Sequence, residues 1–121
     1  MNGFERINAA LNGQWPDKRP ILLHNFMLAA REAGFSMKEY REDPEKAAKS
    51  HIQFVEKYKV DGILLDVDTA ILASALNVPV RYPENEPALA HGALLTSIHE
   101  IKSFEIPDIA DNSPEVKALC N

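Results

Sequence analysis

Two aspartates at the end of a short apolar run are the side chains best placed for chemistry. The run 62–65 is rich in branched residues and is followed by Asp66 and Asp68. Such runs are typical of strands buried on both faces of a parallel sheet, and α/β proteins bind ligands at the carboxyl ends of these strands. We therefore expect Asp66 and Asp68 to face a pocket. Repulsion between the two carboxylates would favour a protonated form of one of them, which could serve as a general acid.

Each aspartate also has a plainer interpretation. Asp66 could be a solvated residue at a strand end, which is somewhat the more frequent case. Asp68 could be the N-cap of the next helix, because an aspartate carboxylate readily accepts a hydrogen bond from a free backbone N–H. The sequence supports this second interpretation about as well as a role in the pocket, and one carboxylate can fill both.

Polar side chains also follow an earlier apolar run. His24 and Asn25 come directly after residues 21–23, so they could line the same pocket if both runs are neighbouring strands. A structural histidine with satisfied hydrogen bonds explains His24 equally well.

Arg31 is a candidate for binding an anionic group. An arginine on a short helix more often lies on a solvated face or pairs with a nearby acid, here Glu32 or Glu39. We favour the solvated or paired arginine, and keep Arg31 as a substrate-binding candidate.

No metal site or nucleophile is suggested by the remaining histidines or the single cysteine. His51, His91 and His99 lack the spacing of metal ligands, and Cys120 has no second cysteine or nearby histidine. The chain also lacks a Gly-rich phosphate loop. We therefore expect no cofactor to be bound by this chain alone.

Length and composition favour one soluble domain. The chain has 121 residues, of which 45% are hydrophobic and 26% charged, enough for a single modest core over residues 1–121. The net charge of −5, with acids and bases interspersed, argues against a nucleic-acid partner. No apolar run is long enough to span a membrane, and no export signal is visible. One cysteine cannot form an internal disulfide, so a cytoplasmic location is expected.

Helical and extended patterns alternate along the first two thirds of the chain. The expected helices are 4–11, 26–33, one from 36 with a restart at 43 that continues to 58 or 59, and 68–76; strands begin at 21, 60 and 78. Ser36 and Glu39 form a capping box, Asp43-Pro44 opens the longest helix, and Asn77 closes the last. This order of strands and helices predicts a parallel sheet.

The signal is weaker beyond residue 82. Residues 83–87 read as a polar loop, and 88–96 fit either a helix or irregular structure. A second capping box at Ser97 and Glu100 predicts a short helical piece, and Ser113-Pro114-Glu115 predicts the start of a last helix.

Several segments together resemble the N-terminal part of the uroporphyrinogen decarboxylase family, which includes corrinoid-dependent methyltransferases that use coenzyme M. The resemblance covers nearly the whole chain and rests on the order and spacing of these segments. The segments are Arg6 to Leu11, Asp17-Lys18-Arg19-Pro20, Ala33-Gly34-Phe35-Ser36, Glu39-Tyr40, Asp43-Pro44-Glu45, and Tyr58 through Ile63 to Asp68.

The resemblance implies the N-terminal portion of a (β/α)8 barrel, with about three parallel strands and their helices. It places the aspartate that binds pyrrole nitrogens in the decarboxylases at Asp68. Arg31 matches the first arginine of the family's carboxylate-binding motif, but Phe35 stands at the second, which argues against a true haem-pathway decarboxylase. The methyltransferase zinc ligands lie in a region absent here, so zinc and a corrinoid are expected only in a complete enzyme. Glu84-Asn85-Glu86-Pro87 replaces a Gly-rich loop of the family.

Two functions follow from the resemblance. The chain could be part of an enzyme that acts on a tetrapyrrole or a corrinoid-linked methyl group, and be inactive alone. It could instead be a non-catalytic fragment that works by pairing with a partner chain. Three strands would leave open edges and apolar surface, so we expect self-association or association with the remainder of a barrel. We also expect Gly62 to lie where neighbouring backbone leaves no room for a Cβ.

Overall fold

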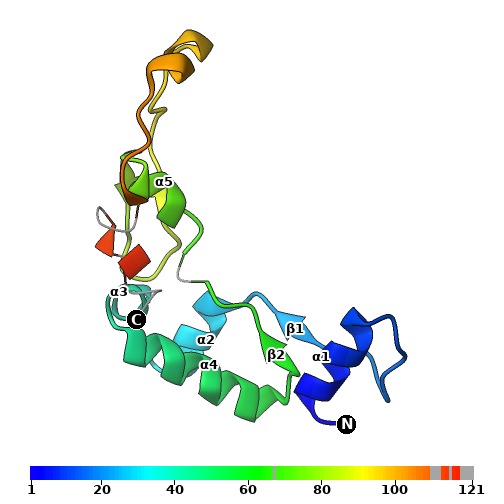
Figure 1. Ribbon diagram of the computed structural model, residues 1–121. Helices are drawn as coiled ribbons and strands as arrows, with labels where there is room; N and C mark the ends of the chain where they lie inside the picture. Colours follow the sequence, from blue (N-terminus) through cyan, green and yellow to red (C-terminus); the bar gives the residue numbers. More distant parts are fainter. Residues whose placement is uncertain (67, 110–112, 115, 118–121) are drawn as a thin grey trace.

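The computed structural model describes residues 1–66, 68–109, 113–114 and 116–117, which form a mixed α/β structure (Figure 1). In chain order its elements are α1 (Gly3–Leu11), β1 (Leu22–Leu23), α2 (Phe26–Glu32), α3 (Met37–Glu42), α4 (Pro44–Tyr58), β2 (Gly62–Ile63), α5 (Ile71–Ala75), β3 (Val80–Arg81), β4 (Leu89–Ala90) and the 3-10 helix η1 (Ile98–Ser103). The helices match the expected segments closely, whereas the strands are much shorter than expected.

The caps predicted at Ser36, Asp43 and Asn77 are confirmed. Ser36 Oγ accepts a hydrogen bond from the Glu39 N–H at 3.1 Å, and the Glu39 carboxylate accepts one from the Ser36 N–H at 3.0 Å. Asp43 caps α4 with Pro44 at its first position, which separates α3 from α4. After α5 the chain turns at Asn77, whose φ of 66° is left-handed. These side chains satisfy backbone groups at helix ends that would otherwise lack partners.

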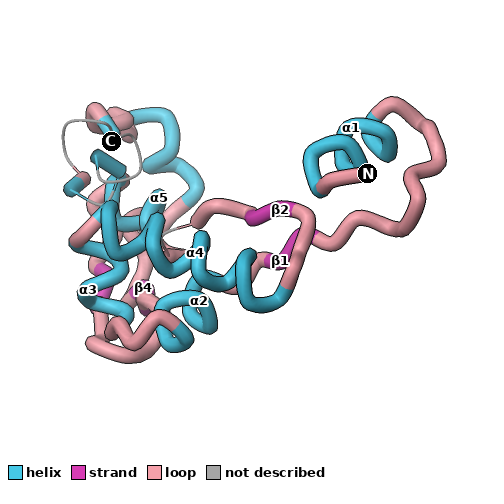
Figure 2. Tube along the Cα trace, turned by 90° about the horizontal axis from the view of Figure 1, so that it is seen from below, coloured by secondary structure: helices cyan, strands magenta, loops and turns pink. Residues whose placement is uncertain are grey.

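Helices α2, α3 and α4 enclose a small core at one end of the β1–β2 pair, and α1 lies at the other end of the pair (Figures 1 and 2). The sequence explains this packing, because apolar residues recur at helical spacing on the faces that meet. The buried cluster consists of Phe26, Ala30, Met37, Tyr40 and Ala47. Tyr40 brings a hydroxyl into this core, so it requires hydrogen-bond partners there.

Strands β1 and β2 are parallel, as expected, with Leu22 opposite Gly62 and Leu23 opposite Ile63. The expectation that the second strand is buried on both faces is wrong for this structure. Leu22, Ile63 and Leu64 are all exposed, because no other strand of the described residues pairs with either edge of this two-stranded sheet.

The third expected strand, β3, does not join the parallel pair. It forms an antiparallel hairpin with β4, in which Val80 lies opposite Ala90 and Arg81 opposite Leu89. The expectation of three parallel strands is therefore corrected to a parallel pair and a separate antiparallel pair. The loop 82–88 returns the chain directly beside β3, and short connections of this kind favour antiparallel pairing.

The chain beyond β4 extends away from the helices to η1 before it returns (Figure 1). Ser97 caps η1 by accepting the His99 N–H at 3.2 Å, while Glu100 bonds the backbone and hydroxyl of Thr96. The last expected helix falls partly on residues that are not described. Among the described helices, none is both long and apolar enough to cross a membrane.

Candidate functional site at the strand ends

His24 and Asp66 meet at the carboxyl edge of the parallel pair. His24 directly follows β1, and Asp66 comes three residues after Ile63 at the end of β2. The His24 Nε2 atom lies 2.8 Å from Asp66 Oδ2, and the two side chains are 43% and 28% exposed. Parallel strands end at the same edge of a sheet, which is why residues 42 positions apart come into contact. The structure thus brings together two of the predicted site residues, both accessible to a ligand.

The backbone of Asp66 is held from inside the core. The Tyr40 hydroxyl donates to the Asp66 carbonyl oxygen at 2.6 Å and also lies 2.7 Å from His51 Nε2. Tyr40 and His51 are each 1% exposed. Sequence reasoning missed both residues as parts of the site, because a tyrosine and a histidine on separate helices carry no local signal of a shared contact.

Burial determines the protonation of this inner pair. It raises the pKa of Tyr40 well above its usual value, and the negative charges of Asp66 and Asp68 raise it further. Burial also lowers the pKa of His51, which favours the neutral imidazole. At neutral pH Tyr40 therefore keeps its proton and His51 carries no charge.

Asp68 lies in a different environment from Asp66. Its side chain is 0% exposed, although we expected it to face a pocket. Asp68 Oδ2 accepts Arg41 Nε–H at 2.6 Å, and Oδ1 accepts the backbone N–H groups of Thr69 at 2.7 Å and Ala88 at 2.9 Å. The N-cap interpretation is also wrong, because Ala70 occupies the cap position of α5 and no side chain bonds there. We call Asp68, Arg41 and the backbone groups that they bind in loop 82–88 the Asp68 clasp.

Arg41 completes the Asp68 clasp from α3. Its Nη1 donates to the Pro83 carbonyl at 2.7 Å, its Nη2 donates to the Glu86 carbonyl, and its guanidinium lies 5.6 Å from the centre of the Tyr82 ring. The clasp therefore fixes loop 82–88 against α3. No local sequence pattern distinguishes Arg41 from the exposed basic residues around it.

Asn25 occupies the N-cap position of α2 but makes no side-chain cap hydrogen bond. Both polar atoms of its amide are buried, and neither has a partner among the described residues. A buried amide without partners is uncommon in proteins. Asn25 therefore retains donors and an acceptor that a ligand or water could use.

Arg31 borders a hollow of about 480 Å³ between α2, the start of α3 and loop 82–88. Its other lining residues are Met27, Leu28, Phe35, Met37 and Asn85. The expected ion-pair partners are engaged elsewhere, since Glu32 pairs with Lys57 and Glu39 with Lys46. Arg31 forms no ion pair with a described residue, which leaves its guanidinium available to an anionic ligand.

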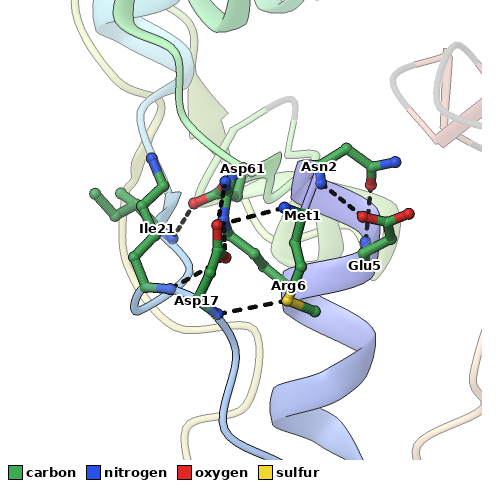
Figure 3. Close-up of polar contacts among 8 residues, drawn as sticks. Met1, Asn2, Glu5, Arg6, Asp17, Ile21 and Asp61 are labelled. Atoms are coloured by element: carbon green, nitrogen blue, oxygen red, sulfur yellow. Dashed lines mark hydrogen bonds and ion pairs between the residues drawn. The ribbon is translucent and has the colours of Figure 1, made fainter.

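A separate polar network joins α1 to the two parallel strands (Figure 3). Arg6 contacts Asp17 at 2.7 Å and Asp61 at 2.8 Å, and Asp61 also accepts the Ile21 N–H at 3.0 Å. Arg6 is the main cause that lowers the pKa of both aspartates. This network anchors the entry of each strand, at the end opposite His24 and Asp66.

No zinc donor set can be assigned to the described part of the chain. No group of three or more histidine, cysteine, aspartate or glutamate residues is placed there to hold a metal ion, and Cys120 lies outside the described residues. The described residues therefore do not fit the zinc site that the resemblance implies for methyltransferases.

A protein-family model described as uroporphyrinogen decarboxylase (URO-D) matches residues 2–121. No curated protein and no solved structure matches the chain significantly.

Proposed function

The chain belongs to the uroporphyrinogen decarboxylase family, and on this premise we propose that it is an N-terminal segment of a barrel enzyme acting on a tetrapyrrole or a corrinoid-linked methyl group. The observation that carries the proposal is the accessible His24–Asp66 pair at the carboxyl ends of β1 and β2. Ligand sites of parallel α/β folds are built at this edge. The segment supplies only part of such a site, so we expect it to be inactive alone. A cytoplasmic location is part of the same proposal.

Arg31 and Asn25 are the proposed binding residues for polar groups of the substrate. Arg31 borders an apolar hollow and has no ion-pair partner among the described residues. A guanidinium beside apolar side chains suits a carboxylate carried on a large hydrophobic framework. The buried amide of Asn25 offers further hydrogen bonds beside His24 in the chain.

Asp68 keeps the electrostatic role that the family implies, with one structural condition. A carboxylate has about four acceptor positions, and Arg41, Thr69 and Ala88 already direct four donor contacts to Asp68. Three of these contacts fall on Oδ1 and one on Oδ2, and the side chain is 0% exposed, so a pyrrole N–H could reach Oδ2 only after the groups that cover it move away. Such a rearrangement would place the carboxylate where it stabilises positive charge developing on a pyrrole.

Binding of two stable ligands tests the proposal without requiring turnover. We expect isothermal titration calorimetry to detect binding of uroporphyrin III, as the tetrapyrrole, or hydroxocobalamin, as the corrinoid. Arg31→Ala should weaken uroporphyrin binding about tenfold, since one charge-assisted hydrogen bond contributes about 1.5 kcal/mol or more. Lys102→Ala removes a comparable charge on η1 and should leave affinity unchanged. Absence of heat with both ligands at millimolar concentration would refute the proposal.

A second candidate is a non-catalytic fragment that acts by association with a partner chain. The observation in its favour is the exposed apolar surface of the parallel pair, formed by Ile21, Leu22, Leu23, Ile63, Leu64 and Leu65. Open strand edges with apolar side chains favour pairing with another chain. The two candidates are compatible, because a partner that covers this surface could also complete the pocket.

A further inference from the structure

The hydrogen bonds of Tyr40 fix the tautomer of His51. A carbonyl oxygen cannot donate, so the Tyr40 hydroxyl must give its proton to the Asp66 carbonyl at 2.6 Å. The contact of 2.7 Å between Tyr40 and His51 Nε2 then requires Nε2–H to be the donor. His51 therefore carries its proton on Nε2, and its buried Nδ1 accepts no hydrogen bond from a described residue.

Asp66 is consequently held at two points. Tyr40 fixes its backbone carbonyl from the core side, and its carboxylate contacts His24 Nε2 from the solvent side. When a carboxylate binds one ring nitrogen of a histidine, the other ring nitrogen remains available to a ligand. For His24 that nitrogen is Nδ1, which forms no hydrogen bond with a described residue and belongs to a 43% exposed side chain.

We propose that His24 Nδ1 exchanges a proton with the bound substrate, that Asp66 orients the imidazole, and that Tyr40 and His51 are positioning residues that hold Asp66. This inference rests on the proposed function and assigns a proton-transfer residue to its site. Asp68 is the less suitable proton carrier, because its side chain is fully buried and already accepts four contacts. Carboxylate-oriented histidines serve as acid and base in many enzymes.

The step requires no other reactant. As a base, neutral His24 takes a proton from the substrate at Nδ1 and becomes an imidazolium, while Nε2–H stays bonded to Asp66. As an acid, the imidazolium returns the Nδ1 proton to the substrate and becomes neutral. The negative carboxylate of Asp66 stabilises the charged form in both directions.

Imidazole tautomers test the positioning network in the full chain. The chain has four histidines, so long-range ¹H–¹⁵N spectra at alkaline pH resolve each ring after assignment by substitution. We expect His24 and His51 each to hold the Nε2–H tautomer, while His91 and His99 show tautomer averages. Asp66→Ala should convert the His24 signal to an average like that of His91.

Tyr40→Phe separates positioning from mere packing. The ring remains, but the hydroxyl that holds Asp66 is lost, so the His24 signal should become averaged although the variant still melts cooperatively. Tyr58→Phe, which removes a hydroxyl elsewhere on α4, should leave the His24 signal fixed. An unchanged His24 tautomer in folded Tyr40→Phe would overturn the positioning role of Tyr40 and His51.

Uroporphyrin III tests the role of His24 itself. Addition of the ligand should shift the His24 Nδ1 resonance and leave His91 and His99 unchanged. Binding seen by calorimetry without a change at His24 would overturn this inference and leave the proposed function standing. If calorimetry shows that neither uroporphyrin III nor hydroxocobalamin binds, that result would overturn the proposed function together with this role for His24.

Discussion

Asp66 and Asp68 are the same residue type two positions apart, yet they lie in opposite environments. The Asp68 clasp is sealed, with a carboxylate and a guanidinium that are 0% and 4% exposed. The His24–Asp66 pair lies open at the ends of two strands whose apolar residues are themselves exposed. In the clasp, the carboxylate binds Arg41 and the backbone N–H of Ala88, which fixes loop 82–88. In the open pair, acceptor positions and a ring nitrogen remain for a ligand.

From this contrast we expect the Asp68 clasp to contribute more to stability, whereas Asp66 is the aspartate that a ligand can reach directly. A buried ion pair must keep all its partners, because an unpaired buried charge is strongly unfavourable. An exposed pair contributes little to stability, since water competes for both groups. Substitution in the clasp should therefore affect folding, and substitution in the open pair should affect ligands.

The largest expected effect concerns the exposed apolar surface of β1 and β2. We predict that the chain self-associates at micromolar concentration through the exposed surface of β1 and β2, which corresponds to about 8 kcal/mol at a Kd near 1 μM. Light scattering coupled to size exclusion measures the mass. Leu64→Lys should shift the chain towards monomer, and Leu72→Lys on α5, which replaces a somewhat more exposed leucine, should not. A stable monomer with a cooperative melt would show that the exposed surface of β1 and β2 needs no partner chain.

The next effect concerns the Asp68 clasp. Arg41→Ala should lower the free energy of unfolding by about 3–5 kcal/mol, because it leaves the Asp68 carboxylate buried without its cation. Urea denaturation measures the change. Arg31→Ala removes an exposed arginine that forms no ion pair with a described residue, and it should change stability by under about 0.5 kcal/mol. Equal stability of Arg41→Ala and the parent would mean that the clasp is not sealed in solution.

Substitution of two glycines where α1 meets β1 and β2 should have a smaller effect on stability. A Cβ on Gly3 would lie 2.4 Å from the Asp61 carbonyl oxygen, whereas a Cβ on Gly62 would meet the Ile7 side chain at 2.9 Å and Leu22 at 3.4 Å. The expectation that backbone excludes a Cβ thus fits Gly3 rather than Gly62. Gly3→Ala should lower the free energy of unfolding by about 1–3 kcal/mol. Gly62→Ala should lower the free energy of unfolding less, because the end of the Ile7 side chain can move. Thermal melts of both variants measure this order, and a larger loss for Gly62→Ala would contradict it.

The smallest effect is a pH dependence from His51. Its pKa is lowered by burial in the folded chain, so below its unfolded pKa near 6.5 the unfolded state binds more protons. This contribution is complete above pH 6.5 and is lost as the pH falls towards the folded pKa. Urea melts between pH 7 and pH 5 measure it. His51→Gln should flatten this dependence, and an equal slope in that variant would contradict the assignment.

Much of the helical structure follows from the sequence alone. The capping box at Ser36 and Glu39, the Asp43-Pro44 start of α4 and the left-handed Asn77 were all predicted and confirmed. Each depends on residues only a few positions apart, so a local pattern contains the necessary information. The parallel pairing of β1 with β2 was also predicted, from the order of apolar runs.

The candidate site was predicted only in part. The sequence identified His24 and Asp66 as residues at strand ends, and the structure joins them. It did not identify Tyr40, His51 or Arg41, whose partners lie on other elements. The antiparallel pairing of β3 was missed because the periodicity of a strand does not specify its partner.

The sequence by itself determined the family, the helices and the presence of two aspartates after β2. Only the tertiary structure decided that Asp66 stays accessible and Asp68 is sealed. The reason is the distance along the chain of the groups that bind them. Asp68 receives Arg41 from 27 positions away and the Ala88 N–H from 20, whereas Asp66 receives Tyr40 from 26 and His24 from 42. Contacts at such separations arise only when the elements pack, and no local pattern encodes them.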